Sequence, residues 1–159
     1  MKRINITLVS LFLVLFLCLP FTSATQKEVG RDGVYVAYAN GIVLDKRTGL
    51  EWLAGPDEDT TWDAADTWVE NVKNGSTGPG GKGWRMPTVN ELQSLYKKGI
   101  GTRNMTPLLK TTGWYVWSGE TQGSSDTMNF IFGYGYGGWY YTSGSAKFRA
   151  FAVRSRSDG

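Results

Sequence analysis

The side chains that most often carry enzymatic chemistry are scarce in this sequence. The chain has no histidine, and its single cysteine, Cys18, lies in an apolar segment close to the N-terminus. Serine–histidine–aspartate and cysteine–histidine catalysis are therefore excluded, and zinc, copper and haem lose their usual ligands. Pairs of carboxylates could still hydrolyse a glycosidic bond, although the sequence does not set the distance between any two of them. We expect a protein that binds rather than catalyses, and that needs no cofactor.

Acidic residues gather at the start of the first predicted helix and could offer oxygen ligands to Ca²⁺. They are Asp57, Glu58, Asp59, Asp63 and Asp66. Their spacing is not that of an EF-hand, because no glycine follows at the sixth position and no glutamate at the twelfth. A solvated helix entrance, with acids near the positive end of the helix dipole, is the simpler interpretation. We expect no metal site here and keep Ca²⁺ as the alternative.

A basic group surrounds the loop after the second predicted helix. It consists of Lys97, Lys98 and Arg103, to which Lys110 and Lys82 could add. Such a group would suit the sulfates of an anionic polymer. The alternative is that these residues are ordinary solubilising charges.

The densest aromatic segment lies near the C-terminus and is interrupted by glycines. Its rings are Tyr134, Tyr136, Trp139, Tyr140 and Tyr141. Exposed rings can stack on the faces of sugars and offer hydroxyl groups for hydrogen bonds. Because side chains alternate along a strand, the alternative is that about half of these rings face the core. Asn129, Glu120 and Asp126 are near in sequence and could add polar contacts.

A small fold of short strands and two helices must position these side chains. Apolar residues at helical spacing predict the first helix from about Trp62 to Val72, with Thr60 or Thr61 as its N-cap and its end near Asn74. Asn40-Gly41 predicts a hairpin turn. Strands are predicted over residues 34–38, 42–44, 50–53, 114–117, 127–132, 139–142 and 148–154.

The second helix is marked by a capping box. Thr88 can accept from a backbone N–H of the first turn while Glu91 reaches back, Pro87 fixes the entry, and Gly99 is expected to end the helix. Tyr96 belongs to its predicted buried stripe. The segments between the elements are predicted as a loose leader at 25–33, a flexible connection at 75–83, a loop at 99–113 and a turn at 133–138. This order of elements predicts one α+β domain.

The N-terminal segment predicts export from the cytoplasm. Lys2 and Arg3 precede an apolar run over residues 4–19, and small residues follow at 22–24. This order is typical of a signal peptide, here residues 1–24, which directs a chain to the periplasm or out of the cell. An uncleaved anchor and a lipid attached to Cys18 are the alternatives. Apart from export we expect no contact with a membrane.

The chain after residue 24 is nearly neutral. Of the 17 basic residues only Lys2 and Arg3 precede residue 25, so 15 basic residues face 14 acidic ones. This balance gives no electrostatic case for nucleic acid as a partner. The length fits one domain, with a leader and first strand over 25–37, the main domain over 38–155 and a tail over 156–159. No disulfide is possible after residue 24, so large aromatic side chains must carry much of the core.

The order of several motifs resembles the Lcl C-terminal domain family, named for the Legionella collagen-like protein. The most specific stretch runs from Gly83 to Leu92, and the likeness covers residues 38–155. Residues matching the structural signature of the family are Trp52, Trp62, Trp84, Arg85, Pro87, Thr88, Glu91, Trp117 and Arg154. Arg85 could be an anion ligand or, alternatively, a clamp that holds the turn before the second helix.

The resemblance implies a C-type-lectin-like fold, related also to sulfatase-modifying enzymes, in a bacterial protein of the periplasm or cell exterior. It also implies a role in binding sulfated polysaccharides and in adhesion. The sulfatase-modifying activity needs cysteines that this chain lacks. Three functions follow in order: a module binding polysaccharide or sulfated glycan, an envelope domain that binds a protein or is structural, and a carboxylate-dependent hydrolase.

Overall fold

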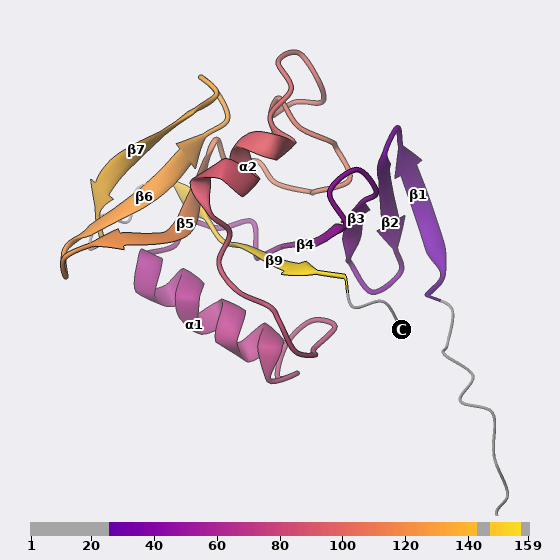
Figure 1. Cartoon of the computed structure of the whole chain (residues 1–159), viewed down its shortest axis with the longest axis horizontal. Helices are drawn as coiled ribbons and strands as arrows, with labels where there is room; N and C mark the ends of the chain where they lie inside the picture. The colour runs from indigo at the N-terminus through magenta and orange to yellow at the C-terminus, as the bar shows by residue number, and fades with distance from the viewer. Residues whose placement is uncertain (1–25, 143–146, 157–159) are drawn as a thin grey trace, which may run out of the picture.

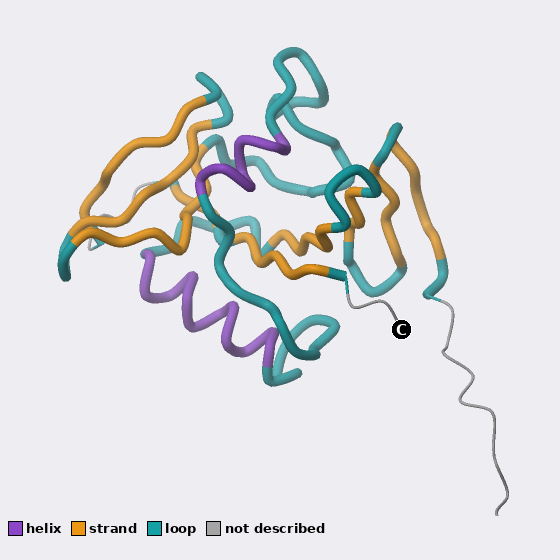
Figure 2. Tube along the Cα trace, viewed as in Figure 1, coloured by secondary structure: helices purple, strands orange, loops and turns teal. Residues whose placement is uncertain are grey.

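The computed structural model describes residues 26–142 and 147–156. The predicted signal peptide, with Cys18, lies outside these residues. In the described part, two helices and two mostly antiparallel sheets form one α+β fold, as the sequence predicted (Figures 1 and 2). Neither helix is long and apolar enough to cross a membrane.

The first sheet contains the N-terminal strands and the last strand of the chain. Its order is β1 (Glu28–Asp32), β2 (Tyr35–Tyr38), β3 (Val43–Asp45), β4 (Leu50–Ala54) and β9 (Phe151–Ser155). The prediction of a loose leader over residues 25–33 is wrong, because β1 pairs with β2 along most of its length. The polar sequence of β1 suits an edge strand, which exposes most of its side chains to water.

The second sheet lies at the opposite end of the molecule (Figure 1). Its order is β7 (Tyr136–Tyr141), β6 (Asp126–Ile131), β5 (Tyr115–Gln122) and β8 (Phe148–Arg149). The predicted turn over 133–138 is too long, since β7 already begins at Tyr136. The predicted strand over 148–154 is divided, because β8 runs parallel to β5 whereas β9 pairs with β4 in the other sheet.

Both helices begin where the sequence predicts. Helix α1 (Trp62–Lys73) is capped by Thr61, whose hydroxyl accepts from the N–H of Ala64. Helix α2 (Val89–Leu95) has the complete capping box of Thr88 and Glu91. It does not continue to Gly99, because the backbone of Tyr96 is already extended.

The core is built around tryptophans that stand far apart in sequence. Trp52, Trp84 and Trp117 are fully buried, and Trp62 is partly buried against the cluster that contains Trp84 and Trp117. Indole N–H groups tie loops to this core: Trp84 donates to the Gly80 carbonyl at 2.9 Å. That bond anchors the glycine-rich segment 75–83, which was predicted as a flexible connection.

Candidate functional site

The turn between β6 and β7 presents two parallel tyrosine rings to solvent. Tyr134 and Tyr136 stack with their ring centroids 5.7 Å apart and an interplanar angle of 16°. Between them Gly135 has φ +83°, and a Cβ there would lie 2.6 Å from ring carbons of Tyr96. Only glycine can adopt this backbone so close to a ring without displacing it. Tyr96, just after α2, therefore supports the turn from below.

The basic loop after α2 is attached to the same turn. The side-chain amide of Asn104 donates to the Phe132 carbonyl at 2.8 Å, and the N–H of Lys97 donates to the Asn104 carbonyl at 2.7 Å. Trp114 lies against Gly133, and the Arg103 guanidinium lies over the Trp114 ring at 4.6 Å. The loop and the turn thus meet through contacts on both sides of Phe132.

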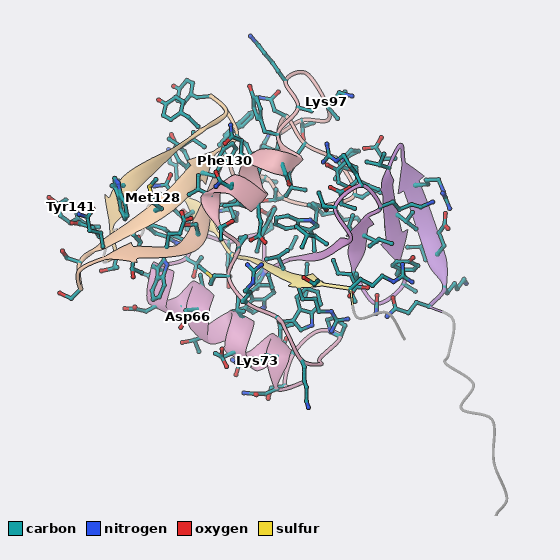
Figure 3. The ribbon with its side chains drawn as sticks, in the orientation of Figure 1. Asp66, Lys73, Lys97, Met128, Phe130 and Tyr141 are labelled. Atoms are coloured by element: carbon teal, nitrogen blue, oxygen red, sulfur yellow. The ribbon has the colours of Figure 1, made fainter. Side chains whose placement is uncertain are left out.

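These contacts create one surface, here called the aromatic–basic corner. It consists of Tyr134, Tyr136, Trp114, Lys97, Lys98 and Arg103. Figure 1 shows the loop after α2 and the β6–β7 turn rising on the same side of the molecule, and Figure 3 labels Lys97 there. The structure therefore brings together two candidate groups that the sequence left separate: part of the aromatic segment and the basic loop.

Arg103 is held in place within the corner. Its Nε donates to the Thr112 carbonyl at 2.7 Å and its Nη1 to the Thr102 carbonyl at 2.8 Å. These bonds do not use Nη2, and the stacking on Trp114 fixes the guanidinium plane. A cavity of about 310 Å³ opens beside it, lined also by Lys110 and by Asp57, which is paired with Arg149. A fixed guanidinium with its Nη2 still free, beside an open cavity, is suited to an anionic group.

The alternative interpretation of the aromatic segment, in which about half of its rings face the core, is wrong. Every ring of the segment is at least 40% exposed. β7 is an edge strand, and Val89 of α2 lies over Gly137, where a Cβ would collide with it, rather than over a ring. Tyr140 still rests on Phe148, with ring centroids 4.9 Å apart, whereas Trp139 and Tyr141 reach further into solvent.

Two predicted polar contacts lie away from the corner. Asn129 is only 3% exposed, and its amide donates to the Gly138 carbonyl at 2.9 Å, so the prediction that it contacts a ligand is wrong. It faces inward because it lies in the middle of β6, beside Trp117. Glu120 accepts from the N–H of Val89 at 3.4 Å, at the opposite end of α2 from the corner.

The acidic segment before α1 forms ion pairs with Arg149 and is not a freely solvated helix entrance. Arg149 is buried, and it donates to Asp57 at 2.8 Å and to Asp59 at 2.6 Å. A hydrogen bond from the N–H of Thr112, together with those of Arg149 and Thr111, lowers the pKa of Asp57 to about 2. No cluster of acidic side chains suited to a metal ion occurs within residues 26–142 and 147–156.

Arg85 and Arg154, two of the residues that match the family signature, stabilise the scaffold. Arg85 donates to both carboxylate oxygens of Glu91, whose other bonds close the capping box, so Arg85 clamps the turn at Pro87. Arg154 donates to Glu51 at 2.7 Å and lies over the Trp84 ring at 4.4 Å. Burial opposes ionisation of Glu91, but hydrogen bonds from Arg85 and Thr88 outweigh it and lower its pKa.

Sequence reasoning missed Trp114 as a part of the corner and Tyr96 as the residue that supports it. Tyr96 was assigned to the buried stripe of α2 and Trp114 to the start of a strand. Their partners, Gly135 and Arg103, are distant in sequence, so no local pattern indicates the contacts. Lys82 does not join the corner, because its neighbour Gly81 lies against Arg154 near the end of α1.

Comparison with known proteins gives one match. No curated protein and no solved structure matches the chain. The model of the Lcl C-terminal domain family matches residues 41–154, which include both helices, the second sheet, strands β3 and β4 and the whole aromatic–basic corner, but not β1 and β2. The chain is therefore a member of the Lcl C-terminal domain family.

Proposed function

We propose that this chain is an exported, non-catalytic module that binds a sulfated or similarly anionic polysaccharide at the aromatic–basic corner. One observation carries the proposal: the exposed Tyr134–Tyr136 stack is contiguous with the loop that carries Arg103, Lys97 and Lys98. Sugar rings and sulfate groups need different contacts, and this surface offers both within one site.

The chemistry of the two halves is complementary. The outer faces of the tyrosine rings can stack on the apolar C–H faces of sugars, and the tyrosine hydroxyls can exchange hydrogen bonds with sugar hydroxyls. The free Nη2 of the fixed Arg103 guanidinium can donate to a sulfate, and the two lysines add positive charge. Binding of a polyanion through such charges weakens as salt is added.

Several carboxylates are already paired with arginines, which supports a binding role over hydrolysis. Glu51, Glu91 and the pair Asp57–Asp59 each form ion pairs with an arginine of the scaffold. Glycoside hydrolysis needs two carboxyl groups facing each other across a cleft, one of which must carry a proton near neutral pH. Hydrogen bonds from Thr112 and Arg149 lower the pKa of Asp57, and hydrogen bonds from Arg85 and Thr88 lower that of Glu91, so these two carboxylates are poorly suited to that role.

A glycan array tests the proposal with protein purified after export. The array should contain sulfated, carboxylated and neutral polysaccharides and be run at low and high salt, with and without Ca²⁺. We expect sulfated glycans to be retained, more weakly at high salt and equally well after chelation of Ca²⁺. Loss of binding on chelation would instead point to a calcium-dependent site.

Matched variants locate the site on the surface. Tyr136→Ala should abolish retention on the array, whereas Tyr141→Ala should not, because Tyr141 is an equally accessible ring at the far end of β7. A folded wild-type protein that retains no glycan in any condition would refute the proposal for the glycans on the array.

A further inference from the structure

A second cavity lies between the β1–β2 hairpin and the chain that follows α2. Its volume is about 330 Å³, and its lining includes Gly33 and Val34 of the hairpin turn, Arg47, and Lys97 after α2. Figure 1 shows the tip of this hairpin and the loop after α2 on the same side of the molecule. Sites for small ligands begin at about 300 Å³. Because Lys97 also belongs to the aromatic–basic corner, the cavity and the corner adjoin.

The register of the first sheet places polar side chains in a row at this cavity. Tyr35 is paired with Asp32 on β1 and with Asp45 on β3, so the three side chains lie on one face of the sheet. The Nη2 of Arg47 donates to the Asp45 carboxylate and to the Ser94 carbonyl, both at 2.9 Å, and to the Tyr35 hydroxyl at 3.3 Å. These bonds fix the guanidinium between β3 and α2.

Three polar groups of the cavity keep hydrogen-bonding capacity for a ligand. The side-chain bonds of Arg47 use only Nη2, so its Nε and Nη1 remain donors without a partner among the described residues. Within residues 26–142 and 147–156 the Asp32 carboxylate, which lines the same cavity, forms no ion pair. Burial and the negative charges of Asp45 and Asp32 raise the pKa of Tyr35, so its hydroxyl keeps its proton and can donate.

The charges around the cavity cancel, which disfavours an ion as its ligand. The fully buried Asp45 carboxylate neutralises Arg47, and Asp32 offsets the positive charge of Lys97. An uncharged ligand rich in hydroxyl groups fits what remains, because each hydroxyl can both donate and accept. Neighbouring hydroxyls of a sugar ring can accept from the free Arg47 donors and donate to the Asp32 carboxylate.

Apolar side chains give the cavity a wall for the other face of such a ring. Val34 is 43% exposed at the tip of the hairpin, and Ile100 lines the cavity from the loop after α2. We propose that this cavity binds one uncharged sugar ring, whose hydroxyls bridge Arg47 and Asp32 while its C–H face lies against Val34 and Ile100. The site does not depend on glycan binding at the aromatic–basic corner.

Nuclear magnetic resonance of the ¹⁵N-labelled purified chain tests the proposal with three uncharged probes: methyl glucoside, methyl galactoside and methyl mannoside. We expect the backbone N–H signals of Gly33 and Val34 to shift with at least one of these sugars at millimolar concentration. Glycine, a zwitterion that could join Arg47 to Asp32 through charges, and sodium sulfate should leave both signals in place.

Variants of the two bridging residues assign the contacts. Asp32→Ala and Arg47→Lys should each weaken binding of the sugar roughly tenfold or more, because each removes hydrogen bonds to a charged group. Arg47→Lys keeps the charge that Asp45 needs but loses the forked donors. Arg31→Gln, on the opposite face of β1, is the matched control and should bind normally. Tyr136→Ala should also bind normally, which separates this cavity from the corner. Circular dichroism establishes that each variant is folded.

The proposal would be overturned if Gly33 and Val34 did not shift with any of the three sugars. Equal shifts from glycine or sulfate would also contradict it, because the cavity would then select charge. So would a sugar affinity that is unchanged in folded Asp32→Ala and Arg47→Lys, since the sugar would then lie elsewhere.

Discussion

Arg149 joins the acidic segment before α1 to the strand β8, which follows it by about ninety residues in sequence. Similar pairs fix other loops of a chain that has no cysteine after residue 24. They are Arg47–Asp45, Arg85–Glu91 and Arg154–Glu51. In three of these four ion pairs, those of Arg47, Arg149 and Arg154, at least one partner is largely buried. Replacing only one partner of such a pair leaves a buried charge without its counterion, which destabilises the fold.

Replacing Asp57 tests this role through its pH dependence. The pKa of Asp57 in the folded chain, about 2, lies below its ordinary value of 3.8. The ionised carboxylate therefore stabilises the fold above about pH 4, and this contribution is lost as the pH falls toward 2. Asp57→Asn should lower the free energy of unfolding at pH 7 by about 1 kcal/mol, a value reduced for solvent screening of a carboxylate that is 38% exposed. Urea denaturation at neutral and acid pH measures this.

Asp66 provides the control for that experiment. Burial and the neighbouring charges of Glu70 and Asp63 raise the pKa of Asp66, so its ionised form is disfavoured in the fold. Asp66→Asn should therefore leave stability at pH 7 unchanged or slightly higher. If Asp57→Asn cost the same at pH 7 and near pH 2, the ion pair with Arg149 would not be the source of its effect.

At the scale of elements, the β6–β7 turn decides where the tyrosine pair stands. The Ile131 carbonyl accepts from the N–H groups of both Tyr134 and Gly135, which makes the turn tight. Tyr96 fills the space beneath it and packs edge-on against Phe130, with ring centroids 6.1 Å apart. The turn is therefore set by α2 and the core rather than by its own residues alone.

Substitution of Gly135 should damage both stability and binding. Gly135→Ala forces a non-glycine residue to a positive φ and places its Cβ against Tyr96, so we expect a loss of about 2 kcal/mol in the free energy of unfolding. Gly138→Ala is the matched control, with ordinary φ and open space, and should change stability by less than about 0.5 kcal/mol. Equal effects of the two substitutions in chemical denaturation would contradict the assigned role of the turn.

The capping box of α2 can be tested in the same way. Thr88→Ala removes the acceptor for the N–H of Glu91 and should cost about 1 kcal/mol. Thr67→Ala, at an exposed position inside α1, removes no cap and should leave stability unchanged or slightly improved. Thermal melting distinguishes the two, and a Thr88→Ala variant as stable as Thr67→Ala would show that the cap contributes little.

The sequence predicted the features that depend on neighbouring residues. The Thr61 cap, the box of Thr88 and Glu91, and the buried stripe of α1 all arise within one or two helical turns, and all are present. It failed at β1, whose polar residues give no strand pattern and which is ordered by pairing with β2. It also failed to join the tyrosine pair to the basic loop, because Gly135–Tyr96 and Arg103–Trp114 are tertiary contacts.

At the scale of the whole molecule, the aromatic–basic corner lies at one end of β7. Tyr136 is the first residue of β7 and Tyr141 is the last, and Figure 3 shows Tyr141 on the side of the molecule away from Lys97.

The lysines of the corner should control the salt dependence of binding. Lys97 and Lys98 are exposed and contribute mobile charge, in contrast to the fixed Arg103. The Lys97→Ala, Lys98→Ala double variant should bind a sulfated glycan more weakly at low salt, with affinity that changes less as salt is added. Replacing Lys82 and Lys46, which lie outside the corner, is the matched control. An unchanged salt dependence in the first variant would place the anion elsewhere.

The most direct test of the account compares one oligosaccharide before and after removal of its sulfates. Isothermal titration of the wild-type protein should give at least tenfold tighter binding, about 1.4 kcal/mol, for the sulfated form. Tyr136→Ala should weaken binding of both forms, whereas Arg103→Gln should weaken mainly the sulfated one. Equal affinity of wild-type protein for the two forms, or the same response of both forms to Arg103→Gln, would contradict a site that joins aromatic rings to an anion-binding loop.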